Sequence, residues 1–158
     1  MNPTDISQLP YRNNISCIVF KEGRYLLVQQ VGWLKNFWKF PQGGIKNDEC
    51  DKETIKRELW EELGIKKCKI IGVGKHLNQY DWSPASVKLA GLRWRGQTQK
   101  FYLIKYLGAD KEIVLCRKEH QNYRWVERRD LRKHIDHDHK NFTNYYSSVE
   151  KVLTEYGM

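Results

Sequence analysis

The segment 43–65 constrains this chain more than any other, because a double-glycine turn leads into a strongly acidic helix. Residues 51–63 contain no Gly or Pro, have acidic residues in the first turn and are followed by a glycine, which is the pattern of a complete helix. At about 100° per residue, Glu58, Glu61 and Glu62 fall on one face of that helix. The sequence therefore predicts a helix that presents three carboxylates together.

The same helix has an apolar edge and an unfavourable charge pair. Ile55, Leu59 and Leu63 form a stripe beside the acidic face, so the helix can bury that edge against a sheet. Glu58 and Glu62 are like charges four residues apart, which costs about 0.2–0.5 kcal/mol on an exposed helix. A divalent cation such as Mg²⁺, which takes carboxylate oxygens, would remove that cost. The alternative is an ordinary solvated acidic face.

The rest of the chain predicts strands around this helix and a second helix at the end. The runs Ile15–Phe20 and Tyr25–Val31 flank Lys-Glu-Gly-Arg and predict a hairpin. Further strands are predicted over Ile70–Val73, Val87–Leu92, Lys100–Tyr106, Ile113–Leu115 and Tyr123–Val126. Helical spacing of apolar residues predicts a closing helix over Lys140–Tyr156. Together these elements favour an α/β sandwich with a mixed sheet, formed by a single domain over residues 1–158.

The net charge and the cysteines indicate what kind of partner the protein binds and in which cellular compartment it lies. The net charge of +9 favours anionic partners such as nucleotides, RNA or acidic lipid, and a lysine-rich soluble surface explains it equally well. The four cysteines form no Cys-x-x-Cys pair, which argues against a zinc ribbon or a thioredoxin-like dithiol, and without a secretory signal we expect reduced thiols instead of a disulfide framework. No apolar run approaches the roughly 20 residues that cross a bilayer, and residues 1–10 lack the pattern of a secretory signal. We therefore expect a cytoplasmic protein with no membrane partner.

The acidic segment also resembles a known motif. It has Gly43, then five residues, Glu49, seven residues, and Arg-Glu-Leu-Trp-Glu-Glu-Leu-Gly-Ile at 57–65. The segment thereby matches every fixed position of the Nudix box. The resemblance implies an α/β/α sandwich with a loop–helix–loop catalytic motif that hydrolyses phosphoanhydride bonds with Mg²⁺ or Mn²⁺ as cofactor. Asp48 stands where the family usually has glycine, which changes the shape of the loop more than its chemistry.

The resemblance assigns roles to individual residues of this motif. Arg57 would orient the carboxylates through charge-assisted hydrogen bonds, and Glu49 would support the geometry between loop and helix. The backbone carbonyl of Gln42 would be a further metal ligand. The implied metal ligands or water activators on the helix are Glu58, Glu61 and Glu62.

Outside the box, the chain resembles the branch of RNA 5′-pyrophosphohydrolases and dinucleoside polyphosphate hydrolases. The matching pieces are Tyr-Arg-Asn-Asn at 11–14, Trp-Lys-Phe-Pro-Gln-Gly-Gly-Ile at 38–45, Gly-Gln-Thr-Gln-Lys-Phe-Tyr-Leu at 96–103, and Glu119 before Tyr-Arg-Trp-Val. In that branch the residue matching Arg12 contacts phosphate, and the residue matching Glu119 is a metal ligand or catalytic base. Further substrate-binding residues implied by these matches are Lys39, Gly43, Gly44, Gln99 and Lys100.

Several of these positions have a plainer interpretation. Arg12 is alternatively a surface charge, Glu119 a polar loop residue, and Gln99 and Lys100 solvent-facing strand residues. The loop before Trp38 holds a single basic residue, unlike that of the RNA enzymes, so their RNA contacts do not transfer directly. Candidate base-stacking aromatics, each alternatively a core residue, are Trp33, Tyr80, Trp82 and Tyr145.

A histidine cluster at 134–139 is the last candidate site. His134, His137 and His139 have a spacing found in some metal sites, but a turn that enters the last helix explains them better. We expect hydrolysis of dinucleoside polyphosphates or of 5′-triphosphorylated RNA ends. The alternatives are sanitation of oxidised nucleoside triphosphates, or a non-catalytic nucleotide sensor, whose mark would be lost box carboxylates. The sequence leaves a monomer and a homodimer equally open.

Overall fold

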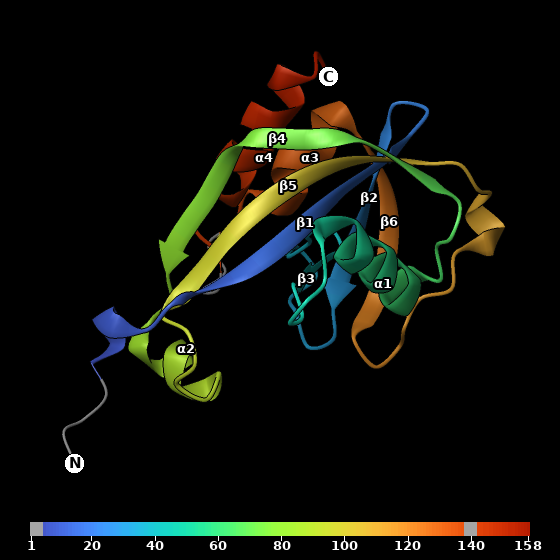
Figure 1. Cartoon of the computed structure of the whole chain (residues 1–158). Helices are drawn as coiled ribbons and strands as arrows, with labels where there is room; N and C mark the ends of the chain where they lie inside the picture. The colour runs from blue at the N-terminus through green and yellow to red at the C-terminus, as the bar shows by residue number, and fades with distance from the viewer. Residues whose placement is uncertain (1–4, 138–141) are drawn as a thin grey trace.

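A six-stranded mixed sheet forms the middle layer of the protein (Figure 1). The structure is a computed structural model, and it describes residues 5–137 and 142–158. The strands lie in the order β4-β5-β1-β2-β6, and β3 pairs with β1. Only β1 and β5 run parallel; the other pairings are antiparallel. The strand bounds are β1 Tyr11–Lys21, β2 Arg24–Gln30, β3 Gln42–Gly44, β4 Cys68–Asp81, β5 Gly96–Tyr106 and β6 His120–Glu127.

Helices cover both faces of this sheet (Figure 1). On one face, α1 packs on apolar side chains of β1 and β2, and on the other face α3 and α4 enclose a second core. The helix bounds are α1 Asp51–Leu63, α2 Pro84–Leu89, α3 Leu131–Ile135 and α4 Tyr145–Glu155, with short 3-10 turns at Ile6–Gln8, Asp110–Glu112 and Arg128–Asp130. The predicted α/β/α sandwich is therefore confirmed. Among the described residues, no helix is long and apolar enough to span a membrane.

The helix α1 has the bounds that the sequence predicts. Its C-terminal cap is Gly64, in a left-handed conformation with φ of 62°. The predicted stripe of Ile55, Leu59 and Leu63 is fully buried, and it packs in the same core as Cys17. Burial of this stripe fixes the rotation of the helix, and so determines where its carboxylates point.

The segment that follows β2 enters the sheet between β1 and β2. These two strands pair only beside the hairpin turn, at Phe20–Tyr25 and Lys21–Arg24. Beyond that point Val28 exchanges two backbone hydrogen bonds with Lys39, of 2.8 and 3.0 Å, and the Cys17 amide donates to the Pro41 carbonyl at 2.8 Å. The double-glycine turn is thereby brought beside the acidic helix.

The strand predicted over Val87–Leu92 is wrong, because this region contains the helix α2. The Ser83 hydroxyl accepts a hydrogen bond from the Ser86 amide at 3.2 Å, and Pro84 occupies the first turn. A serine cap followed by proline is a helix start signal, which prevails over the apolar run that suggested a strand.

The strand predicted over Ile113–Leu115 is also wrong. The Val114 amide donates to the Leu63 carbonyl at 2.8 Å, and the Cys116 amide donates to the Glu62 carbonyl at 2.9 Å. This segment therefore satisfies carbonyls at the end of α1 that have no partner within the helix, instead of joining the sheet.

The predicted closing helix begins later than expected. The helix α4 starts at Tyr145, after Asn144 in a left-handed conformation with φ of 56°. The predicted start at Lys140 lies outside the described residues, as does His139.

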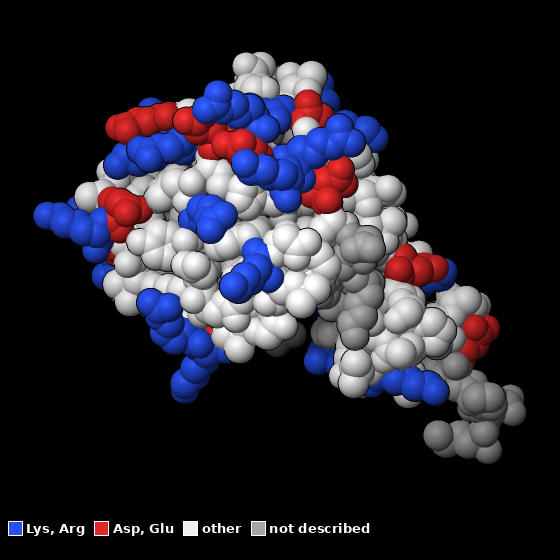
Figure 2. Space-filling view, turned by 180° about the vertical axis from the view of Figure 1, so that it is seen from behind, with Lys and Arg blue, Asp and Glu red and all other residues white. Residues whose placement is uncertain are grey.

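The face that carries α3 and α4 has mixed charge. Figure 2, seen from that side, shows Lys and Arg interleaved with Asp and Glu along its upper part. Ion pairs account for this pattern: Arg128 binds Glu150 at 2.6 Å, and within α3 and its flanking residues two further pairs form at 3.1 Å. The positive charge of the chain does not form a single-sign patch on this part of the surface.

Candidate active site

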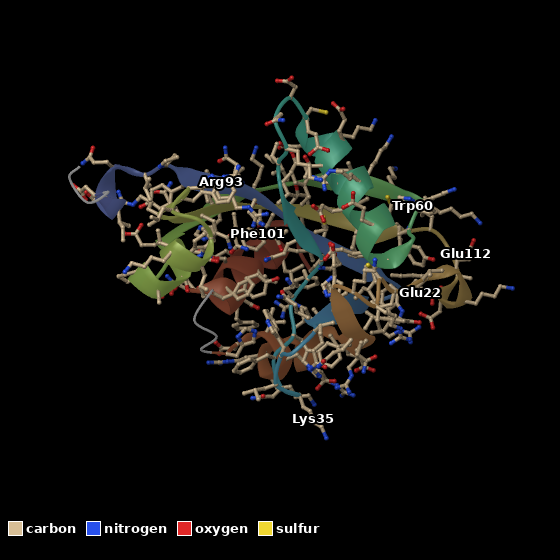
Figure 3. All side chains as sticks on the ribbon, turned by 90° about the horizontal axis from the view of Figure 1, so that it is seen from below. Glu22, Lys35, Trp60, Arg93, Phe101 and Glu112 are labelled. Carbon is tan, nitrogen blue, oxygen red and sulfur yellow. The ribbon has the colours of Figure 1, made fainter. Side chains whose placement is uncertain are left out.

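A cleft of about 850 Å³ is lined by residues of α1, α2 and the strands between them. Figure 3, seen from below, shows α1 and α2 on different sides of the molecule, with Trp60 on α1 and Arg93 close to α2. The predicted site residues that line this cleft are Arg12, Lys39, Gln42, Gly43, Glu58, Glu62 and Glu119. Residues separated by most of the chain are thus brought together.

Arg57 ties the glycine turn to the acidic helix. Its guanidinium donates to both carboxylate oxygens of Glu49 at 2.6 and 2.8 Å, and to the Gly44 carbonyl at 3.0 Å. The Nη1 atom also donates to Glu58 Oε1 at 2.7 Å and to Glu61 Oε2 at 3.3 Å. The hydrogen bonds from Arg57 lower the pKa of Glu49 to about 2, so this carboxylate stays charged.

The two glycines of the turn allow the backbone to approach charged side chains. A Cβ atom at Gly43 would lie 2.0 Å from the carboxyl carbon of Glu58, and one at Gly44 would lie 2.6 Å from Arg12 Nη2. No side chain fits at either position without moving a charged group. The turn therefore needs glycine because the cleft wall is built against it.

Glu62 is a buried carboxylate at the base of the cleft. Its side chain is about 3% exposed, and its Oε1 atom lies 2.5 Å from His120 Nε2. Burial raises the pKa of Glu62 to about 8, with the Glu119 charge acting in the same direction and Lys39 and the Gln42 amide opposing it. Burial, followed by the Glu62 charge, raises the pKa of Glu58 to about 7. Arg57 opposes the shift at Glu58 and Lys39 opposes it at Glu62, but burial outweighs both cations.

Lys39 is a cation inside the same cleft. It is buried, and its Nζ atom donates to Gln30 Oε1 at 3.0 Å and lies 5.2 Å from the centre of the Trp33 ring. Burial lowers the pKa of Lys39, while the neighbouring glutamates act against that shift. This position allows the ammonium to meet an anion that enters the cleft.

The donors at the base of the cleft fit a divalent metal ion. Ligand atoms of Glu62, Glu119 and His120 all lie within 4.8 Å of one another. Glu62 Oε2 and His120 Nδ1 are buried and have no hydrogen-bond partner among the described residues. A bound cation would supply the missing partner for the carboxylate, and carboxylate and imidazole groups are common ligands of divalent ions.

Six predicted site residues lie outside the cleft lining, including Arg57 and Gly44 described above. Glu61 has a side chain 44% exposed and contacts Arg57. The Lys100 ammonium binds Asp51 at the start of α1, at 2.8 Å. Gln99 is fully buried and donates to Gln42 Oε1 at 3.1 Å, while Tyr80 accepts a hydrogen bond from Gln97. A metal or catalytic role for Glu61, and a substrate role for Lys100, Gln99 and Tyr80, stay predictions.

The aromatic and histidine candidates divide between cleft and core. Trp33 and Trp82 line the cleft, whereas Tyr145 is buried and its hydroxyl accepts from the Phe40 amide at 2.9 Å. His134 lies in α3 and His137 follows it, with its Nε2 atom 2.9 Å from the Trp38 carbonyl oxygen. These two histidines therefore have separate structural contacts and do not form a joint site.

Two parts of the cleft were missed from the sequence. His120 was overlooked because it follows Glu119 in a polar stretch, and a histidine next to a candidate ligand is the signal that could have revealed it. The wall contributed by α2, with Ser86 and Leu89, was not predicted because a strand was expected over Val87–Leu92. This wall lies opposite the one that carries the acidic residues.

Comparison with known proteins gives consistent results. Residues 10–146 match the NUDIX domain family. The chain is 35% identical over 136 residues to an RNA pyrophosphohydrolase of Gluconacetobacter diazotrophicus, covering 78% of this chain and 81% of the relative. It is 33% identical over 133 residues to an RNA pyrophosphohydrolase of Dinoroseobacter shibae, covering 80% and 83%.

Solved structures share the fold at lower identity. The E. coli dihydroneopterin triphosphate pyrophosphohydrolase superposes with a TM-score of 0.67 at 15% identity, covering 92% of this chain and 96% of that one. A C. elegans Ap4A hydrolase superposes with a TM-score of 0.62 at 19% identity, covering 91% and 95%. The family match, the relatives and the acidic helix agree, and the chain belongs to the Nudix family of hydrolases.

Proposed function

We propose that this chain is a divalent-metal-dependent pyrophosphohydrolase that acts on 5′-triphosphorylated RNA ends. The observation that carries the proposal is a pair of carboxylates, the buried Glu62 and the partly exposed Glu58, that line a cleft which also holds Arg12 and Lys39. Such a cleft can hold metal ions on one side and phosphate oxygens on the other. RNA is favoured because relatives at 31–35% identity carry the name RNA pyrophosphohydrolase.

In this proposal the residues of the cleft have different roles in binding the metal ion and activating water. Glu62 and Glu119 hold the cation, Mg²⁺ or Mn²⁺, with the Gln42 carbonyl and Glu61 as further candidate ligands. When bound, the ion lowers the pKa of the attacking water and neutralises charge on the phosphate oxygens. Glu58, with a pKa raised to about 7, accepts the proton that the water loses.

The cationic and aromatic residues bind the RNA end. Arg12 lines the cleft beside the glycine turn, so its guanidinium can bind phosphate oxygens in a bidentate manner. Lys39 neutralises a second phosphate, and the amides of the glycine turn donate to the same chain of phosphates. Trp33 and Trp82 offer ring faces for nucleobases.

A rate comparison on two substrates tests the proposal. With Mg²⁺ or Mn²⁺, we expect faster release of pyrophosphate from a 5′-triphosphorylated RNA oligonucleotide than cleavage of diadenosine tetraphosphate, and no turnover with EDTA. The reverse ranking would assign the chain to dinucleoside polyphosphates. Absence of turnover on both substrates and on nucleoside triphosphates would contradict an enzymatic role.

A further inference from the structure

A buried histidine lies among the glutamates of the cleft. Building on the metal-dependent site proposed above, we propose that His120 Nε2 is a direct metal ligand together with Glu62 and Glu119. The site would then have one nitrogen donor among oxygen donors. It would bind a first-row transition ion such as Mn²⁺ more tightly than Mg²⁺.

The local geometry brings the imidazole to the cation position. Ligand atoms of the three residues lie within 4.8 Å of one another, and His120 Nε2 lies 2.5 Å from Glu62 Oε1. Glu62 and His120 are each 2% exposed, and Glu62 Oε2 has no hydrogen-bond partner among the described residues; His120 Nε2 meets Glu62 Oε1, whereas the unpartnered Nδ1 atom of His120 faces away from this contact. Because ligand bonds to such ions are about 2.0–2.2 Å long, Nε2 and Oε1 would have to separate, and an ion bound by both would replace their contact by two ligand bonds.

An irregularity in β6 accounts for the direction of the His120 side chain. Tyr123 and Trp125 point toward the α1 side of the sheet, so strict alternation would place Gln121 on that side next. The pairing of β6 with β2 shifts at Gln29–Gln30, so that Gln30 faces His120 and Gln121 is skipped. Such a bulge re-aims side chains.

The hydrogen bonds of Gln121 agree with a bulge that turns its side chain away from α1. Its side-chain amide donates to Gln29 Oε1 at 2.8 Å and to the Trp33 carbonyl at 3.2 Å. His120 instead reaches Glu62 on α1, and its backbone amide is held by the Cys116 carbonyl at 2.9 Å. The bulge thus exchanges a glutamine for a histidine on the wall that carries the metal ligands.

A nitrogen donor changes which ion the site prefers. Mg²⁺ selects oxygen ligands and gains little from imidazole, whereas transition ions accept imidazole and carboxylate together. A site of glutamates alone would discriminate less between the two kinds of ion. We therefore expect the preference for Mn²⁺ over Mg²⁺ to depend on His120.

Pulsed EPR of the Mn²⁺-loaded full-length protein tests the ligand directly. We expect a ¹⁴N hyperfine coupling from a coordinated imidazole in the wild type, its loss in His120→Gln, and its retention in His76→Gln. Absence of the coupling in the wild type would overturn the proposal, whatever the fold of the variants. Persistence of the coupling in His120→Gln would overturn it too, because another histidine would then be the ligand.

Calorimetric titration of the same proteins measures the selectivity. We expect His120→Gln to lower the Mn²⁺ affinity by about tenfold, in the range seen when groups around a metal are lost, and to change the Mg²⁺ affinity much less. Equal losses for both ions would contradict the inferred role. Neither experiment needs substrate, so turnover of RNA and nitrogen ligation are tested separately.

Discussion

The two ends of the cleft are built in different ways. At the α1 end, Glu62 and His120 are about 2% exposed, and Glu62 Oε1 lies 2.5 Å from His120 Nε2. At the α2 end, Leu89 is 81% exposed and lies on a helix of six residues. The contrast suggests that the α1 end determines the reaction, whereas the α2 end affects which molecule is held there.

The largest expected effect comes from neutralising the buried carboxylate. Glu62→Gln should lower kcat for RNA by about a thousandfold or more, since metal-based stabilisation of the transition state amounts to several kcal/mol. The Tm of the metal-free variant should not fall, because a neutral side chain replaces a carboxyl whose burial opposes ionisation. Glu127→Gln, at an exposed glutamate outside the cleft lining, is the control. Equal losses in both variants would show that burial does not distinguish the two glutamates.

Removing the arginine that joins turn and helix should have the next largest effect. Arg57→Ala deletes charge-assisted hydrogen bonds to Glu49 and Glu58, which are stronger than bonds between neutral groups and hold the turn against the helix. We expect a loss of roughly a hundredfold in kcat/KM and a lower Tm by calorimetry. Arg24→Ala breaks an exposed 3.9 Å contact with Glu22, and should cost less than about 1 kcal/mol. A wild-type Tm in Arg57→Ala would contradict this account.

The α1 end should also respond to pH. The pKa values of Glu58 and Glu62 are raised from 4.5 to about 7 and about 8. Below these values a metal ion must displace protons, so its affinity should rise by about tenfold per pH unit for each proton released. The metal-free fold holds more protons than the unfolded chain between pH 4.5 and 8, so its stability should fall as pH rises through that window.

Titrations in buffers of different ionisation enthalpy count the released protons. Proton release near pH 6.5 that disappears in Glu62→Gln would support the assignment. A metal affinity that does not change between pH 6 and pH 8 would contradict it.

The smallest effect is expected at the α2 end. Leu89→Ala should raise KM for RNA by about threefold, corresponding to roughly 0.7 kcal/mol of apolar contact, and leave kcat and metal affinity unchanged. Leu107→Ala, at another exposed leucine outside the cleft, is the control and should change neither quantity. A change in kcat with Leu89→Ala would remove the distinction between the two ends.

The same contrast explains how far the sequence could predict the structure. The helix α1 was predicted with its full bounds because every signal is local: the acidic first turn, the apolar stripe and Gly64. The helix α2 is short, and its apolar run of Val87–Leu92 resembled a strand more than its Ser-Pro start resembled a helix. Local pattern therefore specified one wall of the cleft and misidentified the other.

Two features were predicted wrongly or missed because they depend on contacts with residues far away in the sequence. Ile113–Leu115 has the composition of a strand, but its backbone bonds to the end of α1, a partner that the local sequence cannot reveal. His120 faces the metal ligands because pairing with β2 shifts by one residue. Strict alternation along β6 would place His120 on the other side of the sheet, so the composition of the proposed metal site depends on the register of the sheet.

The parallel pairing of β1 with β5 has a consequence for how the protein forms. It joins Tyr11 to Gly96 and Phe20 to Lys105, so a large loop of chain must close before these hydrogen bonds can form. Arg12 and Gln97, neighbours in the cleft wall, meet only after that closure. On a translating ribosome, a chain that has emerged only through α1 already carries Arg12, Lys39 and the acidic helix, but it lacks β5, which pairs with β1, and the proposed ligand Glu119. Catalytic competence therefore arrives late in synthesis, once β5 and then β6 have left the exit tunnel.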